Sequence, residues 1–336
     1  MPGKLPPSVL MRIISNYRGC LHENVLLPAC IGEDAGVSYV SNGYVLVVHT
    51  DPITASKNLI GKLSIHVSAN DVASTGARPL YFTLTLLLPD DYGFTDVEHI
   101  MSGVNSALKE LGASLIGGHT EFTSAIKRPV AVSTAIGIAS LGEIVRTSTC
   151  RVGDYVIMTK TAGLEGTSVL AEDYEEELVK AGVDESVIRE ARKLIDNVSV
   201  VKEAIALSTT RVASAMHDAT EGGVLNALYE IALSSRKRLI VYKDKVPVHY
   251  TTSIITKRLG IDPLSILSSG VLAACIPAPL IDRAIGILRY NCIQTSIIGR
   301  VECGDPEVII KNKHGECRVV KECIEDPVIK MSEKLS

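Results

Sequence analysis

The stretch HTDPITASKNLIGKLSIHVSANDVASTGARPLYFTLTLLLP, residues 49–89, sets regular secondary structure beside acidic side chains in places usually taken by apolar ones. A helix is predicted over 58–75, and its 3.6-residue period puts Asp71 on the side that carries the apolar residues. A carboxylate on an inward-facing side is costly unless a cation meets it. Asp51 ends the preceding strand and flanks the same helix, so the two acids together indicate a functional site.

The rest of the first half is predicted to alternate strands and helices around one sheet. A strand over 81–88 is apolar enough to be covered on both faces, and Thr95 is the expected N-cap of the next helix. A hairpin through 37–48 is expected to turn at Asn42-Gly43. Residues 117–121, Gly-Gly-His-Thr-Glu, are predicted to begin a loop after a short strand.

A boundary near 150–154 divides the chain into two predicted domains, 1–150 and 151–336. Each is long enough to bury a core of its own. The second half restarts with a strand over 155–159, and a further strand over 212–216 leads into a glycine-rich turn and a helix. Both halves therefore mix strands and helices in a similar rhythm.

Composition narrows the classes of function. The 336 residues carry a formal charge of −4 and include no Trp and only three Phe, which gives no reason to expect a nucleic-acid partner. No apolar run is long enough to span a bilayer, and the amino terminus resembles no secretory signal. The eight cysteines include no CxxC pair, so neither zinc nor a disulfide framework is indicated. We expect a cytoplasmic protein without a membrane partner.

Four acids of the first half fall in loops or at element ends: Asp34, Asp51, Asp71 and Glu121. Hard oxygen ligands in such places suit Mg²⁺, which usually completes its shell with water and substrate phosphates. For any one of them alone, capping a turn or a helix is the more ordinary role. Taken together in so apolar a half, they favour a metal–phosphate site.

Two glycine-rich turns, 163–167 and 220–223, follow strands and open helices, so their N–H groups could hold an anion. Neither matches the P-loop or the dinucleotide fingerprint, and a plain tight turn explains each as well. His217 and Asp218 stand immediately before the second turn, where they could orient a metal or a phosphate. A strand-end histidine is the alternative for His217, and His119 has the same two interpretations.

Several short motifs span most of the chain: Gly32-Glu33-Asp34-Ala35, Thr50-Asp51, Asn70-Asp71-Val72-Ala73 with Gly76-Ala77-Arg78-Pro79, Gly117-Gly118-His119-Thr120-Glu121, and His217-Asp218-Ala219-Thr220-Glu221-Gly222-Gly223. In order and spacing they resemble the aminoimidazole ribonucleotide synthetase (PurM) superfamily, which includes the hydrogenase maturation factor HypE, selenophosphate synthetase and thiamine-monophosphate kinase. Residues 218–223 and 260–264 are similar to HypE segments and those of its archaeal relatives, whereas 117–120 looks more like selenophosphate synthetase.

The resemblance implies a two-domain PurM-like α+β fold. Its N-terminal ATP-binding domain would join a partner's strands in a dimeric β-barrel, and its C-terminal domain would be an α/β sandwich. It also implies ATP bound through Mg²⁺ near the interface of a homodimer, an unidentified acceptor, and a maturation-factor partner protein. The predicted metal ligands are Asp34, Asp51, Asp71, Glu121 and Asp218. The predicted catalytic residues are Asp71, His119 and Asp218. The predicted cofactor-binding residues are Lys4, Asp34, Asp51, Asn70, Thr120, Gly163, Gly166, Gly222 and Gly223.

The resulting prediction is a HypE-like, Mg²⁺-dependent enzyme that uses ATP to phosphorylate or activate a carbonyl or phosphoryl acceptor. The alternatives are a non-catalytic ATP-binding assembly factor in hydrogenase or metallocentre maturation, and a metal hydrolase that binds no nucleotide. HypE proteins typically end in a cysteine, whereas the last cysteine here is Cys323. The resemblance therefore supports ATP binding without supporting dehydration by the HypE route.

Overall fold

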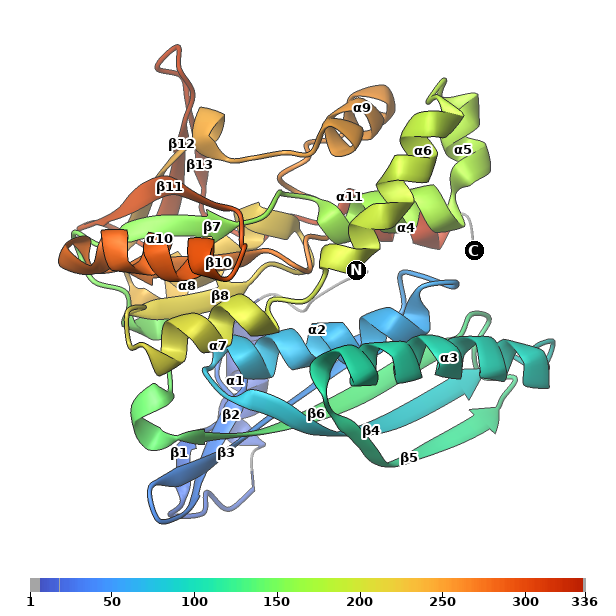
Figure 1. The fold of residues 1–336 in the computed structure, drawn as a ribbon, viewed down its shortest axis with the longest axis horizontal. Coiled ribbons are helices and arrows are strands. Elements are labelled where there is room, and N and C mark those ends of the chain that lie inside the picture. The colour runs from blue at the N-terminus through green and yellow to red at the C-terminus, as the bar shows by residue number, and fades with distance from the viewer. Residues whose placement is uncertain (1–6, 18, 335–336) are drawn as a thin grey trace.

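The computed structural model describes residues 7–17 and 19–334 as two β-sheets with helices packed against them (Figure 1). The first half builds a six-stranded sheet in the order β1-β2-β3-β6-β4-β5, and the second a seven-stranded sheet in the order β13-β12-β9-β11-β7-β10-β8. This arrangement confirms the mixed α+β class. Within the described residues, no helix has the length and apolar character needed to cross a bilayer.

The first half contains three α-helices and six strands among the described residues. Its helices are α1 (Pro7–Asn16), α2 (Ile60–Ser74) and α3 (Phe94–Leu111). Its strands are β1 (Val25–Leu27), β2 (Gly36–Ser41), β3 (Tyr44–Ile53), β4 (Arg78–Leu88), β5 (Ser114–Phe122) and β6 (Val130–Ser140). The predicted hairpin is confirmed, because Asn42 and Gly43 join β2 to β3 with φ of 50° and 80°.

The second half has eight α-helices and seven strands in the part of the chain that is described. The helices are α4 (Leu164–Asp173), α5 (Glu175–Lys180), α6 (Glu185–Arg192), α7 (Val201–Thr209), α8 (Gly223–Ser235), α9 (Tyr250–Leu259), α10 (Ile281–Tyr290) and α11 (Pro327–Lys334). The strands are β7 (Tyr155–Thr159), β8 (Ala215–Asp218), β9 (Arg238–Tyr242), β10 (Leu272–Ile276), β11 (Thr295–Glu302), β12 (Glu307–Lys311) and β13 (Cys317–Val320).

Helix α2 lies between the six-stranded sheet and the second half of the molecule (Figure 1). All but one of its 15 residues are buried, so the single inward stripe expected from the sequence is too narrow. Close packing against α3 depends on Gly61, where an added Cβ would lie 2.0 Å from the carbonyl oxygen of Ile100. The helix that carries Asp71 is therefore held rigidly at the centre of the molecule.

Three local predictions are wrong. Strand β4 buries only alternate side chains, such as Phe82 and Leu84, so one of its faces remains partly open. Residues 117–121 belong to strand β5, which pairs in parallel with β4, and do not form a loop. The N-cap of α3 is Gly93 and not Thr95, because the Asp96 carboxylate accepts a 2.7 Å hydrogen bond from the Gly93 N–H.

Strand β8 is shifted relative to its prediction over 212–216, and it begins at Ala215. His217 and Asp218 are therefore its last two residues, paired with β10 through Ala273 and Leu272. Both are buried where the strand meets the turn into α8. His217 and Asp218 were expected to follow the strand, but this register makes both of them part of the sheet. The division into domains at residue 150 stays a prediction.

Candidate functional site

Four of the predicted metal ligands line one cavity of about 370 Å³. It lies between the first-half sheet and β8, and the acids in it are Asp34, Asp51, Asp71 and Asp218. Loop residue Asp34, strand residue Asp51 and helix residue Asp71 come from three separate places in the first half. The chain thus gathers carboxylates from both halves around a single space.

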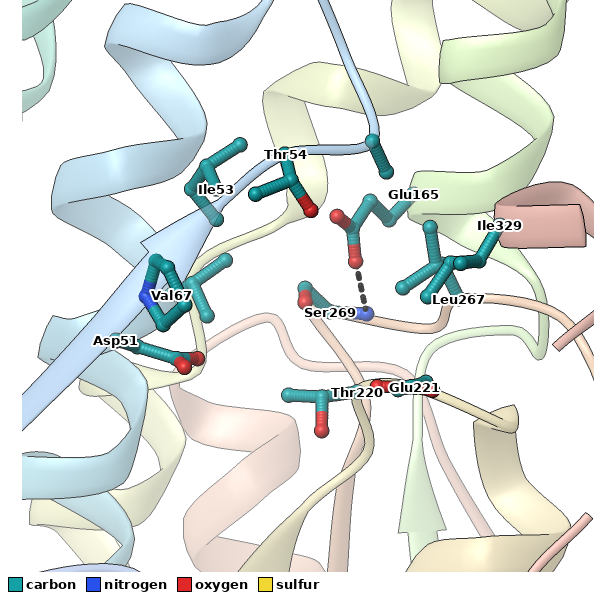
Figure 2. Close-up of a pocket in the computed structure, with 12 residues that line it drawn as sticks. Asp51, Ile53, Thr54, Val67, Glu165, Thr220, Glu221, Leu267, Ser269 and Ile329 are labelled. Atoms are coloured by element: carbon teal, nitrogen blue, oxygen red, sulfur yellow. Dashed lines mark hydrogen bonds between the residues drawn. The ribbon is translucent and has the colours of Figure 1, made fainter. Parts of the chain in front are cut away.

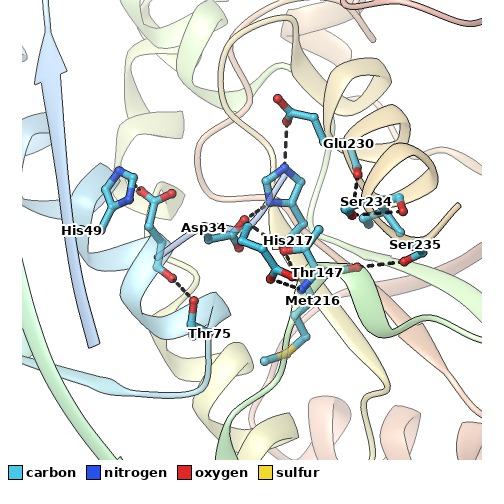
Figure 3. Close-up of polar contacts among 12 residues, drawn as sticks. Asp34, His49, Thr75, Thr147, Met216, His217, Glu230, Ser234 and Ser235 are labelled. Atoms are coloured by element: carbon cyan, nitrogen blue, oxygen red, sulfur yellow. Dashed lines mark hydrogen bonds and ion pairs between the residues drawn. The ribbon is translucent and has the colours of Figure 1, made fainter. Parts of the chain in front are cut away.

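His217 is held between two carboxylates in this cavity (Figure 3). Its Nδ1 contacts Asp34 Oδ1, and its Nε2 lies 2.8 Å from Glu230 Oε2. Burial alone lowers the pKa of His217, but the two carboxylates outweigh it and hold that pKa well above its usual value. With both nitrogens protonated, the ring has no lone pair for a metal and acts as a cation that fixes Asp34.

A second histidine, His49, stands beside the first-half acids. Its Nε2 lies 3.5 Å from Asp71 Oδ2, and Asp51 follows two residues later on β3. Ligand atoms of His49, Asp51 and Asp71 all lie within 4.8 Å of one another, as do those of Asp34, His217 and Asp218. The two groups together make a compact, strongly acidic centre.

The donor set fits a hard divalent cation such as Mg²⁺. Asp34 and Asp218 are buried to 5% and 1% exposure, and Asp34 Oδ2 is a buried oxygen with no hydrogen-bond partner among the described residues. Carboxylates crowded in a poorly solvated space are costly unless positive charge is brought in. Oxygen ligands of this kind are those that Mg²⁺ prefers.

A second cavity, of about 390 Å³, adjoins the first, and Asp51 and Thr220 line both (Figure 2). Glu165, at the first turn of α4, contributes its carboxyl group and is only 3% exposed. Its Oε2 accepts a 3.3 Å hydrogen bond from the Ser269 N–H. Burial raises the pKa of Glu165 to about 7, although the hydrogen bond from Ser269 opposes it.

The remaining predicted residues of the first half are not brought to this centre within one chain. His119, Thr120 and Glu121 lie on β5 and are exposed, and His119 Nε2 contacts Glu121 Oε2 at 2.9 Å. Strand β5 is three strand positions from β3, or about 14 Å. Lys4 lies outside the described residues.

Asn70 is fully buried and holds the two halves together. Its Nδ2 donates to the carbonyl oxygen of Val198, and its Oδ1 accepts from the N–H of Val200, each at 2.8 Å. Both ends of the amide are therefore engaged with the second half. Asn70 therefore links the two halves of the molecule. Its side chain is engaged there and does not face the cavity, in contrast to the cofactor-binding role predicted for it.

The glycines predicted to hold phosphate do not form an open anion cradle, because their N–H groups donate within the chain. Close packing explains them: an added Cβ on Gly222 would lie 1.9 Å from Asn226 Nδ2, and one on Gly223 would lie 2.4 Å from the Ile266 carbonyl oxygen. The acceptors are Ser268 Oγ for Gly163, the Leu267 carbonyl for Gly166, Asp326 Oδ2 for Gly222 and the Thr220 carbonyl for Gly223.

Three residues of the site were missed from the sequence. His49 had a signal, since residues two apart on a strand share a face and Asp51 was already a candidate. Glu165 stood inside a turn that was considered only for its glycines. Glu230 had no local signal, because its relation to His217 depends on how α8 packs against β8.

Comparison with known proteins gives matches along most of the chain. The AIR synthase related protein N-terminal domain matches residues 32–139, and the C-terminal domain of the same family matches 151–311. A putative hydrogenase expression/formation protein of Methanocaldococcus jannaschii is 29% identical over 80% of this chain and 78% of its own length. The carbamoyl dehydratase HypE of Rhizobium leguminosarum is 27% identical over 79% of this chain and 73% of its own.

Solved structures of HypE share the fold. A HypE–HypF complex matches with a TM-score of 0.73 and 22% identity, covering 94% of this chain and 99% of that chain. The hydrogenase maturation protein HypE in complex with ATP matches with a TM-score of 0.72 and 20% identity, covering 94% and 91%. These likenesses show a two-domain PurM-like fold. No closed barrel is formed by the described residues, whose six-stranded sheet is open.

Proposed function

The chain belongs to the AIR synthase related family, and on that premise we propose that it binds Mg²⁺–ATP and uses it to activate an acceptor in a HypE-like role in hydrogenase maturation. The observation that carries the proposal is the shared cavity of Asp34, Asp51, Asp71 and Asp218. HypE in a solved structure of the same fold binds ATP, and a similar curated relative is a carbamoyl dehydratase.

In this proposal the four aspartates hold Mg²⁺, which neutralises negative charge on the phosphates and on the group transferred. Protonated His217 fixes the direction of the Asp34 carboxylate, and Glu230 holds the other side of the imidazole ring. Asp71 projects from a helix that is buried on nearly every side, so its carboxylate is preorganised. Activation of a carbonyl or phosphoryl oxygen then requires the acceptor to lie beside Asp51.

We further propose that the active form is a homodimer. All nine residues of the edge strand β5 are exposed, including the apolar side chains of Leu115, Ile116 and Phe122. An exposed edge strand with apolar residues favours pairing with another chain. A second copy covering β5 would also offer His119, Thr120 and Glu121 a place at the interface. Light scattering on wild type and on Ile116→Lys tests this: a wild-type monomer would contradict it.

A maturation-factor protein is the expected macromolecular partner, since HypE of the same fold has been solved in complex with HypF. If the chain only assembles with such a partner, it will bind ATP without turning it over. The formation of ADP or AMP from ATP therefore distinguishes the proposal from this alternative.

Incubation of the full chain with Mg²⁺–ATP, with and without candidate acceptors, tests the proposal. We expect ADP or AMP to form only when an acceptor is present, and the rate to fall at least about 100-fold in Asp71→Asn, as for loss of a key electrostatic group. Tight binding with no product from any acceptor would favour the assembly factor. A chain whose melting temperature does not rise with any nucleotide would contradict both.

A further inference from the structure

The segment that joins the two halves carries an inference about the candidate metal site, and it rests on the Mg²⁺ binding proposed above. Residues 140–150 lie outside both matched family domains. Within this segment, Thr147–Thr149 forms a short 3₁₀ helix that contacts α8 and β8. Thr147 is only 2% exposed, whereas Arg146 and Thr149 on either side of it are exposed. Its buried hydroxyl group therefore needs a partner inside the protein.

All three polar groups of Thr147 are hydrogen-bonded to other parts of the chain. Its N–H donates to Glu33 Oε2, and its carbonyl oxygen accepts from Ser235 Oγ, each at 3.1 Å. Its hydroxyl donates to Asp34 Oδ1 at 3.2 Å and to the carbonyl oxygen of Met216 at 3.0 Å (Figure 3). The hydroxyl has a single proton, so these two acceptors share it. Thr147 thus links the loop that carries Asp34 to β8 and α8.

The two carboxylate oxygens of Asp34 have different surroundings. Oδ1 receives the hydroxyl of Thr147 and also contacts Nδ1 of His217. Oδ2 is buried without a hydrogen-bond partner among the described residues, and Asp34 lines the candidate metal cavity. Donors on Oδ1 restrain rotation of the carboxylate, which is otherwise loosely restricted in an aspartate. Asp34 depends on such donors because it lies in an irregular loop, whereas Asp51 and Asp71 lie on a strand and a helix.

We propose that Thr147 is a positioning residue of the divalent-cation site: its hydroxyl, together with the imidazole of His217, holds Oδ1 of Asp34 and leaves Oδ2 to bind the cation. The two donors come from separate elements, the 3₁₀ helix of the connecting segment and strand β8, so they restrain the carboxylate from both. Thr147 acts through Asp34 and does not itself bind the cation. Hydrogen bonds of this kind to a ligating side chain typically change metal affinity by about 10- to 100-fold.

Thr147→Val tests the assignment, because valine has nearly the shape of threonine and lacks the hydroxyl. Mn²⁺ is the probe, since it takes the same oxygen ligands as Mg²⁺. Its binding to the full chain at pH 7 without nucleotide is followed by electron paramagnetic resonance of the free ion. We expect the Kd for Mn²⁺ to rise at least about tenfold in Thr147→Val and to stay within about threefold of wild type in Thr147→Ser, which keeps the hydroxyl.

Thr149→Val is the matched control. The hydroxyl of Thr149 donates to the carbonyl oxygens of Arg146 and Ser214, away from the acids, so no change in Kd is expected. Thr147→Ala, which removes the hydroxyl without placing a second methyl group beside Asp34, should weaken Mn²⁺ binding as Thr147→Val does. This second variant keeps the test open if the valine variant does not fold.

Urea denaturation of the same proteins separates positioning from a merely structural role. A lower free energy of unfolding with an unchanged Kd in the variants without the hydroxyl would overturn the assignment. An equal loss of affinity in Thr147→Ser, or a wild type that binds no Mn²⁺, would overturn it too. Calorimetry of Mg²⁺–ATP reports on the proposed function separately: wild type that binds Mn²⁺ but no Mg²⁺–ATP would contradict that function and leave the role of Thr147 to the Mn²⁺ titrations.

Discussion

Two acid-lined cavities share Asp51, yet only one of them has a protonated histidine beside its acids. Around Asp34 the acids gather about protonated His217, whose pKa is held up by the carboxylates on either side. Around Glu165 the buried carboxyl group has no such cation among the lining residues described, and its pKa rises to about 7. A protonated imidazole therefore accompanies the acids of one cavity, whereas burial dominates the pKa of Glu165 in the other.

The difference shows that the two cavities are distinguished by neighbouring charge and not by the degree of burial of their acids. Asp34 and Glu165 are 5% and 3% exposed, so the two carboxyl groups are buried to a similar degree. The acids beside His217 suit a metal and its phosphates, whereas a pKa of about 7 leaves Glu165 largely protonated below that pH.

Removing the imidazole of His217 should have the largest effect on the difference between the two cavities. His217→Leu leaves the Asp34 and Glu230 carboxylates facing a buried apolar side chain in place of a cation. We expect the free energy of unfolding to fall by about 3–5 kcal/mol, as when one partner of a buried ion pair is lost. Urea denaturation at pH 7 without metal measures it.

His99 on α3 offers the matched control, since it is an exposed histidine and His99→Leu should change the free energy of unfolding by less than about 0.5 kcal/mol. Adding Glu230→Gln to His217→Leu should recover part of the loss. Equal stability of the two leucine variants would mean that His217 does not balance the acids.

The pH dependence of the free energy of unfolding tests the protonation of Glu165 in the second cavity. Between about pH 4.5 and 7 the unfolded chain loses the Glu165 proton that the folded chain keeps, so this residue makes the free energy of unfolding fall as pH rises. We expect Glu165→Gln to gain about 3 kcal/mol relative to wild type between pH 5 and pH 8. Urea denaturation across that range measures the difference.

The acids that face Glu165 are Asp51, Asp326 and Glu221, and their own titration is present in both proteins. Asp326, whose pKa burial raises to about 6, adds a slope that cancels in the comparison. Stability curves of wild type and Glu165→Gln that run parallel across the range would show that Glu165 is ionised in the folded chain.

Much of the fold could be predicted because its signals are local. Helix α2, the Asn42-Gly43 turn and strand β7 depend on periodicity and on turn residues, which a single stretch of sequence contains. The acids Asp34, Asp51 and Asp71 could be chosen because carboxylates beside apolar runs are unusual. The sequence predicted that these acids lie close together, and the structure places all three in one cavity.

What could not be predicted depends on contacts between distant parts of the chain. Gly222 and Gly163 looked like phosphate-binding glycines, but their N–H groups bond to Asp326 and Ser268, which lie 104 and 105 residues away. Residues 117–121 of strand β5 were expected to begin a loop because they are rich in glycine and polar side chains, and pairing with β4 overrides that local preference. Glu230 could be found only once α8 was packed against β8.

The central claim is that the acids of the Asp34 cavity hold Mg²⁺–ATP, and calorimetric titration of Mg²⁺–ATP into wild type and Asp71→Asn tests it most directly. Asp91→Asn, an exposed change of the same kind, is the control. We predict that wild type and the control bind alike and that Asp71→Asn loses at least about 100-fold in affinity, or about 2.8 kcal/mol, with unfolding stability retained. Equal affinity in all three proteins would contradict the account.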